Sequence, residues 1–164
     1  EKPSATDKEA LAPFIVAIDG FPDQLEAGVS HLSPEQLASP TLPGIWTVNQ
    51  VIHHLAASHM NAFVRTKLIL TETNPTVKPY DEAEWAKLPD VVHVPARISI
   101  ELLKSLHARW AVLLASLGGG MFERTYFHPE YKTTTRLADM AALHAWHGKH
   151  HLGYIQELIE RRGW

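Results

Sequence analysis

Apolar residues recur at helical spacing over most of the chain. Between about residues 7 and 31, the repeating positions are Leu11, Phe14, Ile15, Ile18 and Phe21. Spacings of three and four residues place these side chains on one face of an amphipathic helix. Pro22 follows directly, and because proline has no backbone N–H to donate, a break or kink is expected there. A similar repeat over residues 99–117 predicts another helix, which the glycines at 118–120 end.

Capping signals mark where two further helices begin. Thr47 and Gln50 have the spacing of a capping box, in which each side chain bonds the backbone N–H of the other residue. A long helix is therefore expected from Thr47 to about Leu70. Ser33 followed by Pro34 predicts the start of a short helix, because proline suits the first helical position.

Three segments are expected to be connections. Residues 39–45 contain two prolines and a glycine, and residues 74–95 contain four prolines with few apolar repeats. One helical turn is expected within the second of these, near residues 82–85. Residues 124–133 are also expected to be a connection, and no run of alternating positions predicts a strand.

The last apolar repeat predicts a helix from about Thr135 to Gly163, since glycine suits the residue that follows a helix. The chain is therefore expected to be an all-α protein, an antiparallel four-helix bundle in a single domain over residues 1–164. The helices that begin near Thr47 and Thr135 are expected to pack face to face. Bundles of this kind commonly build metal sites from side chains on facing helices.

Composition narrows the classes of function. The chain has 15 Lys and Arg against 18 Asp and Glu, and this net charge of −3 gives no electrostatic footprint for nucleic acid. Its apolar stretches are shorter than the ~18 residues that a membrane span needs, and the polar residues 1–10 do not read as a signal peptide. The absence of cysteine excludes disulfides and thiolate ligands, and it fits a cytoplasmic location.

Histidine is strongly enriched, with 11 in the chain and four of them between positions 144 and 151. On a helix, His147 and His151 lie about 40° apart and one turn from each other, so both imidazoles can bind the same ion. Gly148 follows His147, which excludes the H-E-x-x-H motif of metalloproteases. Two donors do not hold zinc firmly, so at least one more ligand is expected from another helix.

The helix that begins near Thr47 offers three candidates for that ligand. His59 falls within its apolar stripe, His54 lies on one flank of the stripe, and His53 lies on the opposite flank. A polar row that can line a pocket runs beside His54 and consists of Ser58, Asn61 and Arg65. Spacing favours His54 weakly and leaves His59 open.

The other histidines of the last helix are expected to have structural roles. His144 lies on roughly the same face as the pair, where a core position or a position behind the ligands is favoured over ligation. His150 lies off that face and is expected at the surface. A single helical histidine is more often a surface or hydrogen-bonded core residue than a ligand, so the hypothesis depends on the pair together with a third donor.

Five segments carry a family resemblance that covers nearly the whole chain. They are WTVNQVIHHLAASHMN at 46–61, KPYDE with WA at 78–86, LHARW at 106–110, HP at 128–129 and WHGKHHL at 146–152. Together they resemble the DinB/YfiT-like superfamily, and within it the YfiT branch of metal-dependent hydrolases. Other members of the superfamily are bacillithiol and mycothiol S-transferases and a thiol-dependent maleylpyruvate isomerase.

The resemblance implies a four-helix bundle, often a homodimer, in which three histidines hold one divalent metal ion. By motif these ligands are His54, His147 and His151, with zinc the favoured ion and nickel the alternative. The sequence departs from the YfiT pattern at Ala57, where aspartate is expected, and at Tyr154, where histidine is expected. The first departure removes a carboxylate that would otherwise be available as a base.

Two reactions suit a three-histidine site. A bound ion can activate water for hydrolysis or a low-molecular-weight thiol for S-transfer, and the missing carboxylate tilts the expected mechanism modestly towards thiol chemistry. The chain is thus expected to be a metal-dependent hydrolase or thiol S-transferase that acts on a small molecule. A non-catalytic metal-binding stress-response protein is the alternative. The candidate substrate contacts are Asn61, Arg65, Tyr80 and His107.

The predicted ligands also imply a pH dependence. Imidazole must be neutral to coordinate, and its ordinary pKa is about 6.5. Metal affinity is therefore expected to fall as the pH drops through roughly 6 to 5.

Overall fold

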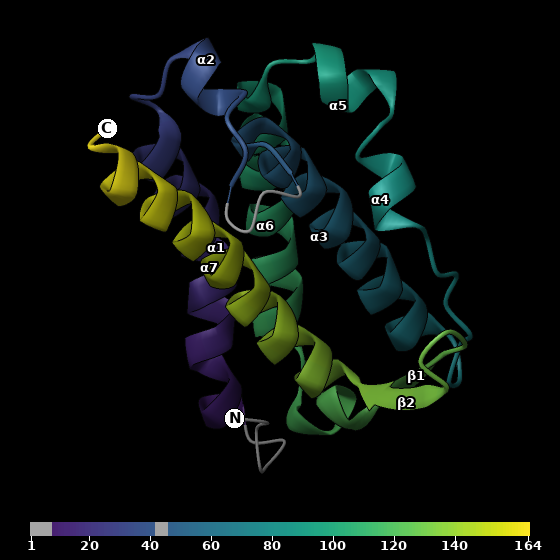
Figure 1. The fold of residues 1–164 in the computed structure, drawn as a ribbon. Helices are drawn as coiled ribbons and strands as arrows, with labels where there is room; N and C mark the ends of the chain where they lie inside the picture. Colours follow the sequence, from purple (N-terminus) through teal and green to yellow (C-terminus); the bar gives the residue numbers. More distant parts are fainter. Residues whose placement is uncertain (1–7, 42–45) are drawn as a thin grey trace.

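Four long helices form a bundle in the computed structural model, which describes residues 8–41 and 46–164 (Figure 1). They are α1 (Lys8–Val29), α3 (Val48–Thr71), α6 (Ala96–Ser116) and α7 (Leu137–Arg162). Each turns an apolar face towards the others, and this tertiary packing supplies most of the stability of such helices. The predicted four-helix bundle is confirmed, and α3 packs against α7 as expected.

The four helices do not simply alternate in direction. α3 and α6 run parallel, since His53 bonds Ser99 near their starts and Thr66 bonds Trp110 further along both. α1 and α7 also run parallel, whereas α3 and α7 are antiparallel (Figure 1). Residues 72–95 carry the chain back along the bundle between α3 and α6, and a long crossover of this kind is one of the standard ways to connect a bundle.

Side-chain caps fix where two of the helices begin. The N–H of Gln50 donates to Thr47 Oγ1 at 3.2 Å, and the N–H of Thr47 donates to Gln50 Oε1 at 2.9 Å. The predicted capping box is therefore confirmed. Ser33 and Gln36 form a second capping box ahead of the short helix α2 (Pro34–Leu37).

The crossover contains two short helices. α4 (Glu82–Trp85) is the predicted turn, whereas α5 (Pro89–His93) was not expected. Pro89 occupies its first turn, where the missing N–H of proline costs nothing, and Val91 is buried against the bundle. Of the loop expected over residues 39–45, positions 42–45 lie outside the described residues.

α1 continues through Pro22, so the break expected there is wrong. Proline at position 22 removes the N–H that would bond the carbonyl of Ile18, four residues earlier. The Nδ1–H of His107, on α6, donates to that carbonyl instead. The carbonyl is thus satisfied by another helix, and α1 does not have to end at the proline.

A β-hairpin and a 3₁₀ helix replace the connection expected over residues 124–133. The 3₁₀ helix η1 (Gly119–Glu123) follows α6, and β1 (Thr125–His128) then pairs antiparallel with β2 (Thr133–Arg136). The last helix begins two residues later than expected, because Thr135 belongs to β2. It ends at Gly163 as predicted, in the left-handed conformation with φ 68°.

The hairpin is fixed to the bundle by a third segment and by its own buried face. The N–H of Phe127 donates to the carbonyl of Pro75, and its carbonyl accepts from the N–H of Val77. Tyr126 and His128 are buried, so burial alternates along β1 as in a strand with one covered face. The prediction of no strand is therefore wrong at this place.

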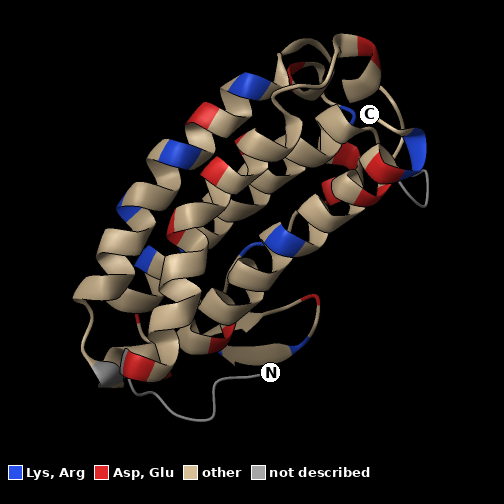
Figure 2. Ribbon diagram, turned by 90° about the vertical axis from the view of Figure 1, so that its left-hand side faces the viewer, with Lys and Arg blue, Asp and Glu red and all other residues tan. Residues whose placement is uncertain are grey.

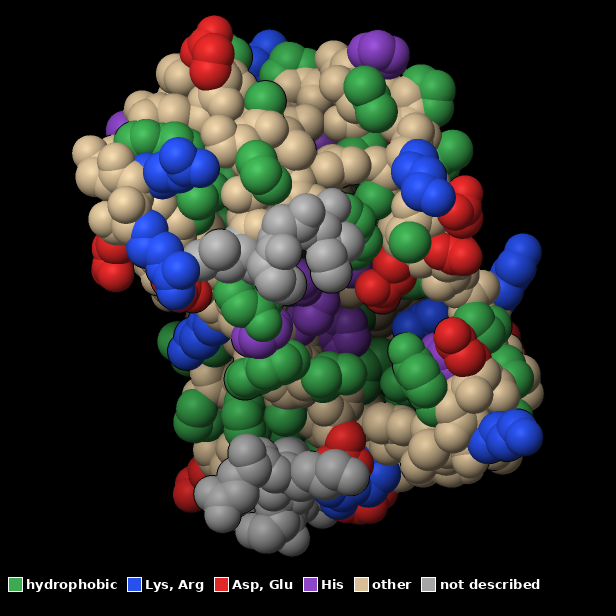
Figure 3. Space-filling model, in the orientation of Figure 1, with side chains coloured by type: hydrophobic (Ala, Val, Ile, Leu, Met, Phe, Trp, Pro, Cys, Tyr) green, Lys and Arg blue, Asp and Glu red, His purple; other side chains and the backbone are tan. Residues whose placement is uncertain are grey.

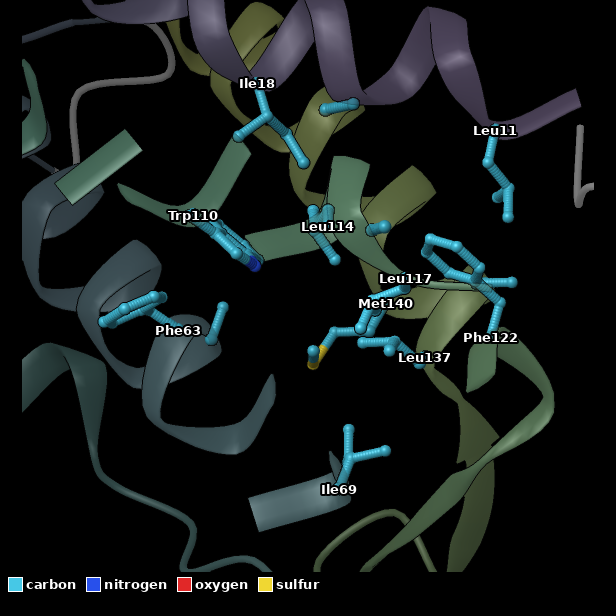
Figure 4. Close-up of a cluster of buried hydrophobic side chains, with 14 of the residues drawn as sticks. Leu11, Ile18, Phe63, Ile69, Trp110, Leu114, Leu117, Phe122, Leu137 and Met140 are labelled. Carbon is cyan, nitrogen blue, oxygen red and sulfur yellow. The ribbon is translucent and has the colours of Figure 1, made fainter. Parts of the chain in front are cut away.

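The apolar core consists of two clusters. The first includes Leu11, Ile18, Phe63, Trp110 and Met140 and is drawn in Figure 4. The second includes Phe21, Leu25, Ile52, Leu103 and Ile155. On α3 and α7, His59, His147 and His151 occupy positions between residues of one cluster and residues of the other. The candidate chemistry therefore lies at the boundary between two well-packed apolar regions.

Charged side chains are spread over the outside of the bundle. Figure 2 shows Lys and Arg interleaved with Asp and Glu along the helices, as the small net charge leads one to expect. Of the helices described, none combines the length and the apolar character needed to cross a membrane.

Candidate metal centre

The structure brings the ring nitrogens of His54, His147 and His151 together. The Nε2 atom of His147 lies 3.3 Å from Nε2 of His54 and 3.2 Å from Nε2 of His151. One potential ligand atom from each ring lies within 4.8 Å of the other two. The three residues proposed from the sequence as metal ligands thus form one cluster.

The two spacings from His147 fit ligands of a tetrahedral zinc ion. With Zn–N bonds of about 2.05 Å, two ligands of a tetrahedron lie about 3.3 Å apart, whereas two ligands at right angles would lie about 2.9 Å apart. A ring nitrogen of neutral imidazole has either one N–H or one lone pair. Without an ion, Nε2 of His147 could therefore make only one good hydrogen bond, although two other ring nitrogens face it. The donor set therefore fits a divalent ion, and three imidazoles leave a fourth position for another ligand.

Helix geometry and packing place the three rings. His147 and His151 lie one turn apart on α7, as their spacing predicts. His54 lies in the second turn of α3, whose start is fixed by the Thr47 capping box. The ring of Trp46 packs against that of His54, with centroids 4.7 Å apart. The cluster therefore forms where the start of α3 meets the middle of α7.

Burial keeps the clustered imidazoles neutral. Desolvation, assisted by repulsion from neighbouring imidazoles, lowers the pKa of His54 and of His151 to about 4. The same causes lower the pKa of His147 to about 2. Because neutral imidazole is the form that binds metal ions, all three rings are ready to coordinate at neutral pH.

Two further histidines form a hydrogen-bonded chain behind His147. Its Nδ1 lies 3.3 Å from Nε2 of His59, and Nδ1 of His59 lies 2.8 Å from Nε2 of His107. His59 and His107 are fully buried, and desolvation lowers the pKa of each. His59, the alternative third ligand, thus faces the outer nitrogen of His147 and lies outside the three-histidine cluster.

The remaining histidines near the site have structural contacts. Nδ1 of His144 bonds a carbonyl of its own helix at 2.9 Å, and desolvation lowers the pKa of this buried ring to about 4. His53 uses both ring nitrogens, one with a serine of α6 and one with a backbone carbonyl. His150 is partly exposed and stacks on Trp146. His144 is thus buried in the core as expected, and His53, the remaining candidate for the third ligand, has both ring nitrogens engaged elsewhere.

Two hollows reach the clustered histidines from the surface. Figure 3 shows histidine side chains in the middle of one face of the molecule, with hydrophobic side chains beside them. The larger hollow, of about 230 Å³, reaches His147 and lies between α3, α7 and the hairpin. Its lining includes Ser58, Arg65, Tyr80, Glu82, Tyr126 and His128. The smaller hollow, of about 150 Å³, reaches His54.

Tyr80 and Glu82 line both hollows. The Tyr80 hydroxyl is buried and has no hydrogen-bond partner of normal geometry among the described residues. Burial, with the nearby charge of Glu82, raises the pKa of Tyr80 to about 12, so this hydroxyl is a neutral donor. Desolvation raises the pKa of Glu82, and the charge of Glu130 adds to the effect. A donor and a carboxylate of increased basicity therefore stand beside the cluster.

The four candidate substrate contacts divide into two pairs. Arg65 and Tyr80 line the larger hollow. Asn61 donates to the carbonyl of Ala57 on its own helix at 2.9 Å and lines neither hollow. His107 lies fully buried behind His59, so its side chain cannot contact a substrate directly. The structure therefore places Arg65 and Tyr80 at the larger hollow, and Asn61 and His107 away from both hollows.

Several lining residues were missed in the sequence. Tyr126 and His128 reach the larger hollow from a hairpin that was expected to be a connection, and Glu82 reaches it from the crossover. The run of threonine and aromatic residues at 125–128, followed by three threonines at 133–135, is a strand signal that indicates the hairpin. No local signal places Glu82 at the site, because its position depends on the path of the whole crossover.

Known proteins resemble this chain over most of its length. A family profile described as the DinB superfamily matches residues 17–155. A protein of Bacillus mycoides named "Putative metal-dependent hydrolase" is 45% identical over 157 residues, covering 96% of this chain and 90% of its own. A protein of Geobacillus thermodenitrificans with the same name is 44% identical over 164 residues, covering 100% and 92%. YfiT from Bacillus subtilis, described as a "probable metal-dependent hydrolase with an unusual four-helix bundle topology", is 39% identical with a TM-score of 0.96, covering 100% and 94%.

Proposed function

Because this chain belongs to the DinB superfamily, we propose that it is a metal-dependent enzyme in which His54, His147 and His151 hold one zinc ion. The observation that carries the proposal is the convergence of three imidazoles beside a hollow, with Nε2 of His147 at the spacing of a tetrahedral ligand from Nε2 of both other rings. When bound, the ion supplies a Lewis acid that lowers the pKa of a water molecule or thiol next to it. A hollow that reaches the ligands favours an enzyme over a non-catalytic metal-binding protein.

We propose hydrolysis of a small molecule as the reaction. The relatives and the structural neighbour carry that activity in their names. The carboxylate that is missing at Ala57 is replaced in this proposal by Glu82, which lines both hollows and has a raised pKa. Glu82 accepts the proton of the attacking water, and the neutral Tyr80 hydroxyl donates to the substrate oxygen on which charge develops. Arg65 orients a polar or anionic part of the substrate.

The test is a hydrolysis screen with zinc-loaded protein and a panel of small esters, amides and lactones. Glu82→Gln is expected to lower kcat by about 100-fold or more, the usual size of a lost general base, while zinc content stays unchanged. Glu84→Gln on the same short helix is the matched control, because Glu84 lines neither hollow and is paired with Lys87. Equal activity of wild type and Glu82→Gln would remove Glu82 from the mechanism.

Transfer of a low-molecular-weight thiol is the second candidate. It is favoured by the composition of the cluster, in which three neutral imidazoles and no carboxylate are grouped among the described residues. A thiol needs less help from a base than water does, since its ordinary pKa of about 8.5 is much closer to neutral. Thiol-dependent consumption of an electrophile that is insensitive to Glu82→Gln would favour this reaction over hydrolysis.

The metal and the assembly are also open to direct test. Zinc is proposed over nickel because the two nitrogen spacings from His147 are nearer to those of a tetrahedron than to those of ligands at right angles. Metal analysis of protein purified without added metal identifies the bound ion. The homodimer implied by the family resemblance stays a prediction, which light scattering at several protein concentrations checks.

A further inference from the structure

A chain of three imidazoles links all four long helices at the site. From α7, Nδ1 of His147 meets Nε2 of His59 on α3, whose Nδ1 meets Nε2 of His107 on α6. Nδ1 of His107 then meets the backbone carbonyl of Ile18 on α1. Phe21 covers the inner two rings, with centroids 5.8 Å from His59 and 5.9 Å from His107.

The Ile18 carbonyl determines which ring nitrogen of each of these three imidazoles carries the hydrogen. A carbonyl can only accept, so Nδ1 of His107 must carry a hydrogen, and Nε2 of this neutral ring must accept. His59 therefore donates from Nδ1 and accepts at Nε2. His147 in turn donates from Nδ1, and its Nε2 is left with a free lone pair. That lone pair faces the Nε2 atoms of His54 and His151.

Pro22 explains why the carbonyl of Ile18 is available. In an uninterrupted α-helix this carbonyl would accept from the N–H of residue 22, and proline has none. The carbonyl thus lacks its usual partner on its own helix. A buried carbonyl in this state needs a donor, and His107 provides it. The proline in α1 and the histidine in α6 form one feature of the fold.

We propose that His107 and His59 are positioning residues that hold His147 in the Nδ1–H tautomer, so that its Nε2 lone pair is presented to the metal ion. This inference rests on the metal site proposed above. It also explains why the rings of His59 and His107 are fully buried between the two apolar clusters. Hydrophobic side chains of similar size would fill the same space without the free-energy cost of desolvating polar groups. Partners that orient a metal-bound histidine are commonly worth 10–100-fold in metal affinity.

Two substitutions at position 107 separate tautomer control from core packing. In His107→Gln the amide oxygen reaches the position of Nε2 and can accept from Nδ1–H of His59. In His107→Asn the shorter amide reaches the position of Nδ1, so it can bond the Ile18 carbonyl but leaves His59 without an acceptor. Zinc affinity, measured by competition with a chromophoric chelator, is expected to fall about 10–100-fold in His107→Asn and to be largely restored in His107→Gln.

A second measurement reads the tautomer directly. In protein freed of metal and labelled with ¹⁵N-histidine, two-bond ¹H–¹⁵N spectra should show His147 protonated on Nδ1 in the wild type and in His107→Gln. In His107→Asn the two tautomers of His147 should both be populated. His53→Leu is the matched control. It removes another buried histidine of α3 that makes two hydrogen bonds but does not belong to the row of three hydrogen-bonded imidazoles, so it should change neither the zinc affinity nor the tautomer of His147.

The outcomes separate the two proposals. If the wild type and His147→Ala bind zinc equally, the metal site itself is wrong. If His147→Ala loses zinc while His107→Asn keeps wild-type affinity and a single His147 tautomer, the site stands and the positioning role is overturned. Equal losses in His107→Gln, His107→Asn and His53→Leu would also overturn it, since they would reflect disturbed packing alone.

Discussion

A ligand histidine and a core histidine differ in which ring nitrogens are already used. His53 is held at both, with Nδ1 2.7 Å from Ser99 Oγ and Nε2 2.9 Å from the carbonyl of Val94. It therefore has no lone pair to offer, although it is the immediate neighbour of His54 in the sequence. In the cluster, the Nε2 atoms contact only one another. A metal ion between them would give each lone pair a partner.

Alanine substitutions should separate these two classes of histidine. His54→Ala, His147→Ala and His151→Ala are each expected to reduce bound zinc from one ion per chain to a small fraction, because two imidazoles do not hold zinc firmly. His53→Ala should keep its zinc and lose about 1–3 kcal/mol of unfolding free energy, since it leaves buried groups unsatisfied. Metal analysis after gel filtration, together with urea unfolding, measures both quantities.

His59→Ala provides the contrast on the same helix. It should weaken zinc binding without abolishing it, because His59 contacts the outer nitrogen of His147 and not the ion. Complete loss of zinc in His59→Ala combined with retention in His54→Ala would show that the third ligand has been assigned to the wrong residue.

Local spacing was sufficient for two of the three proposed ligands. The one-turn separation of His147 and His151 follows from helical geometry alone. The choice of His54 over His59 needed the family resemblance, because both lie on or near the buried side of α3. What decides between them is that His59 faces His107 on α6, and this contact between helices cannot be inferred from the periodicity of either one.

At the level of elements, features with local causes were predictable and those with distant causes were not. The starts of α2 and α3 follow from capping boxes within four residues. The continuity of α1 through Pro22 depends on His107, 85 positions later in the chain. The hairpin likewise depends on the pairing of Phe127 with the segment at 75–77. Sequence patterns describe what a segment prefers, whereas these partners come from other parts of the fold.

At Gly148, α7 packs closely against Phe21, the side chain that covers the rings of His59 and His107. A Cβ atom at this position would lie 2.8–2.9 Å from three ring carbons of Phe21. That ring covers His59 and His107 and is itself buried, so it has little room to move. Gly148→Ala is therefore expected to lower the unfolding free energy by about 1–2 kcal/mol, since overpacking outweighs the gain in helix propensity.

Gly153 on the same helix is the matched control for this prediction. A Cβ atom there would meet nothing within 4 Å, and the residue is exposed. Gly153→Ala should therefore stabilise the protein by about 0.5–1 kcal/mol through helix propensity alone. Urea unfolding of both variants measures the two shifts. A stabilising effect of the same size at Gly148 would mean that Phe21 moves freely and that the contact does not constrain the site.

For the molecule as a whole, the histidine layer ties stability to pH. Burial lowers the pKa of His54, His144 and His151 to about 4 in the folded state, whereas an unfolded chain has the ordinary value of about 6.5. Between these two values the unfolded state binds more protons, so its free energy falls relative to the folded state. The stabilisation is thus fully present above about pH 6.5 and is lost as the pH falls towards 4.

This linkage also moves the pH range in which protons compete with the metal. The sequence alone suggested a loss of affinity between about pH 6 and 5, on the assumption of ordinary imidazoles. In the fold, the clustered rings stay neutral down to about pH 4, because desolvation and mutual repulsion disfavour their charged forms. Protons therefore destabilise the metal-free bundle at a higher pH than the one at which they displace zinc from the folded protein.

Melting curves at several pH values test this ordering. With chelator present, the melting temperature should be constant above about pH 7 and should fall between about pH 6.5 and 4.5, where each buried histidine contributes up to about 1.4 kcal/mol per pH unit. With zinc in excess, the melting temperature should be higher at every pH, and the increase due to zinc should persist at about pH 5 because the folded ligands are still neutral. If that increase vanishes by about pH 6, the clustered imidazoles have ordinary pKa values and are not desolvated as the structure indicates.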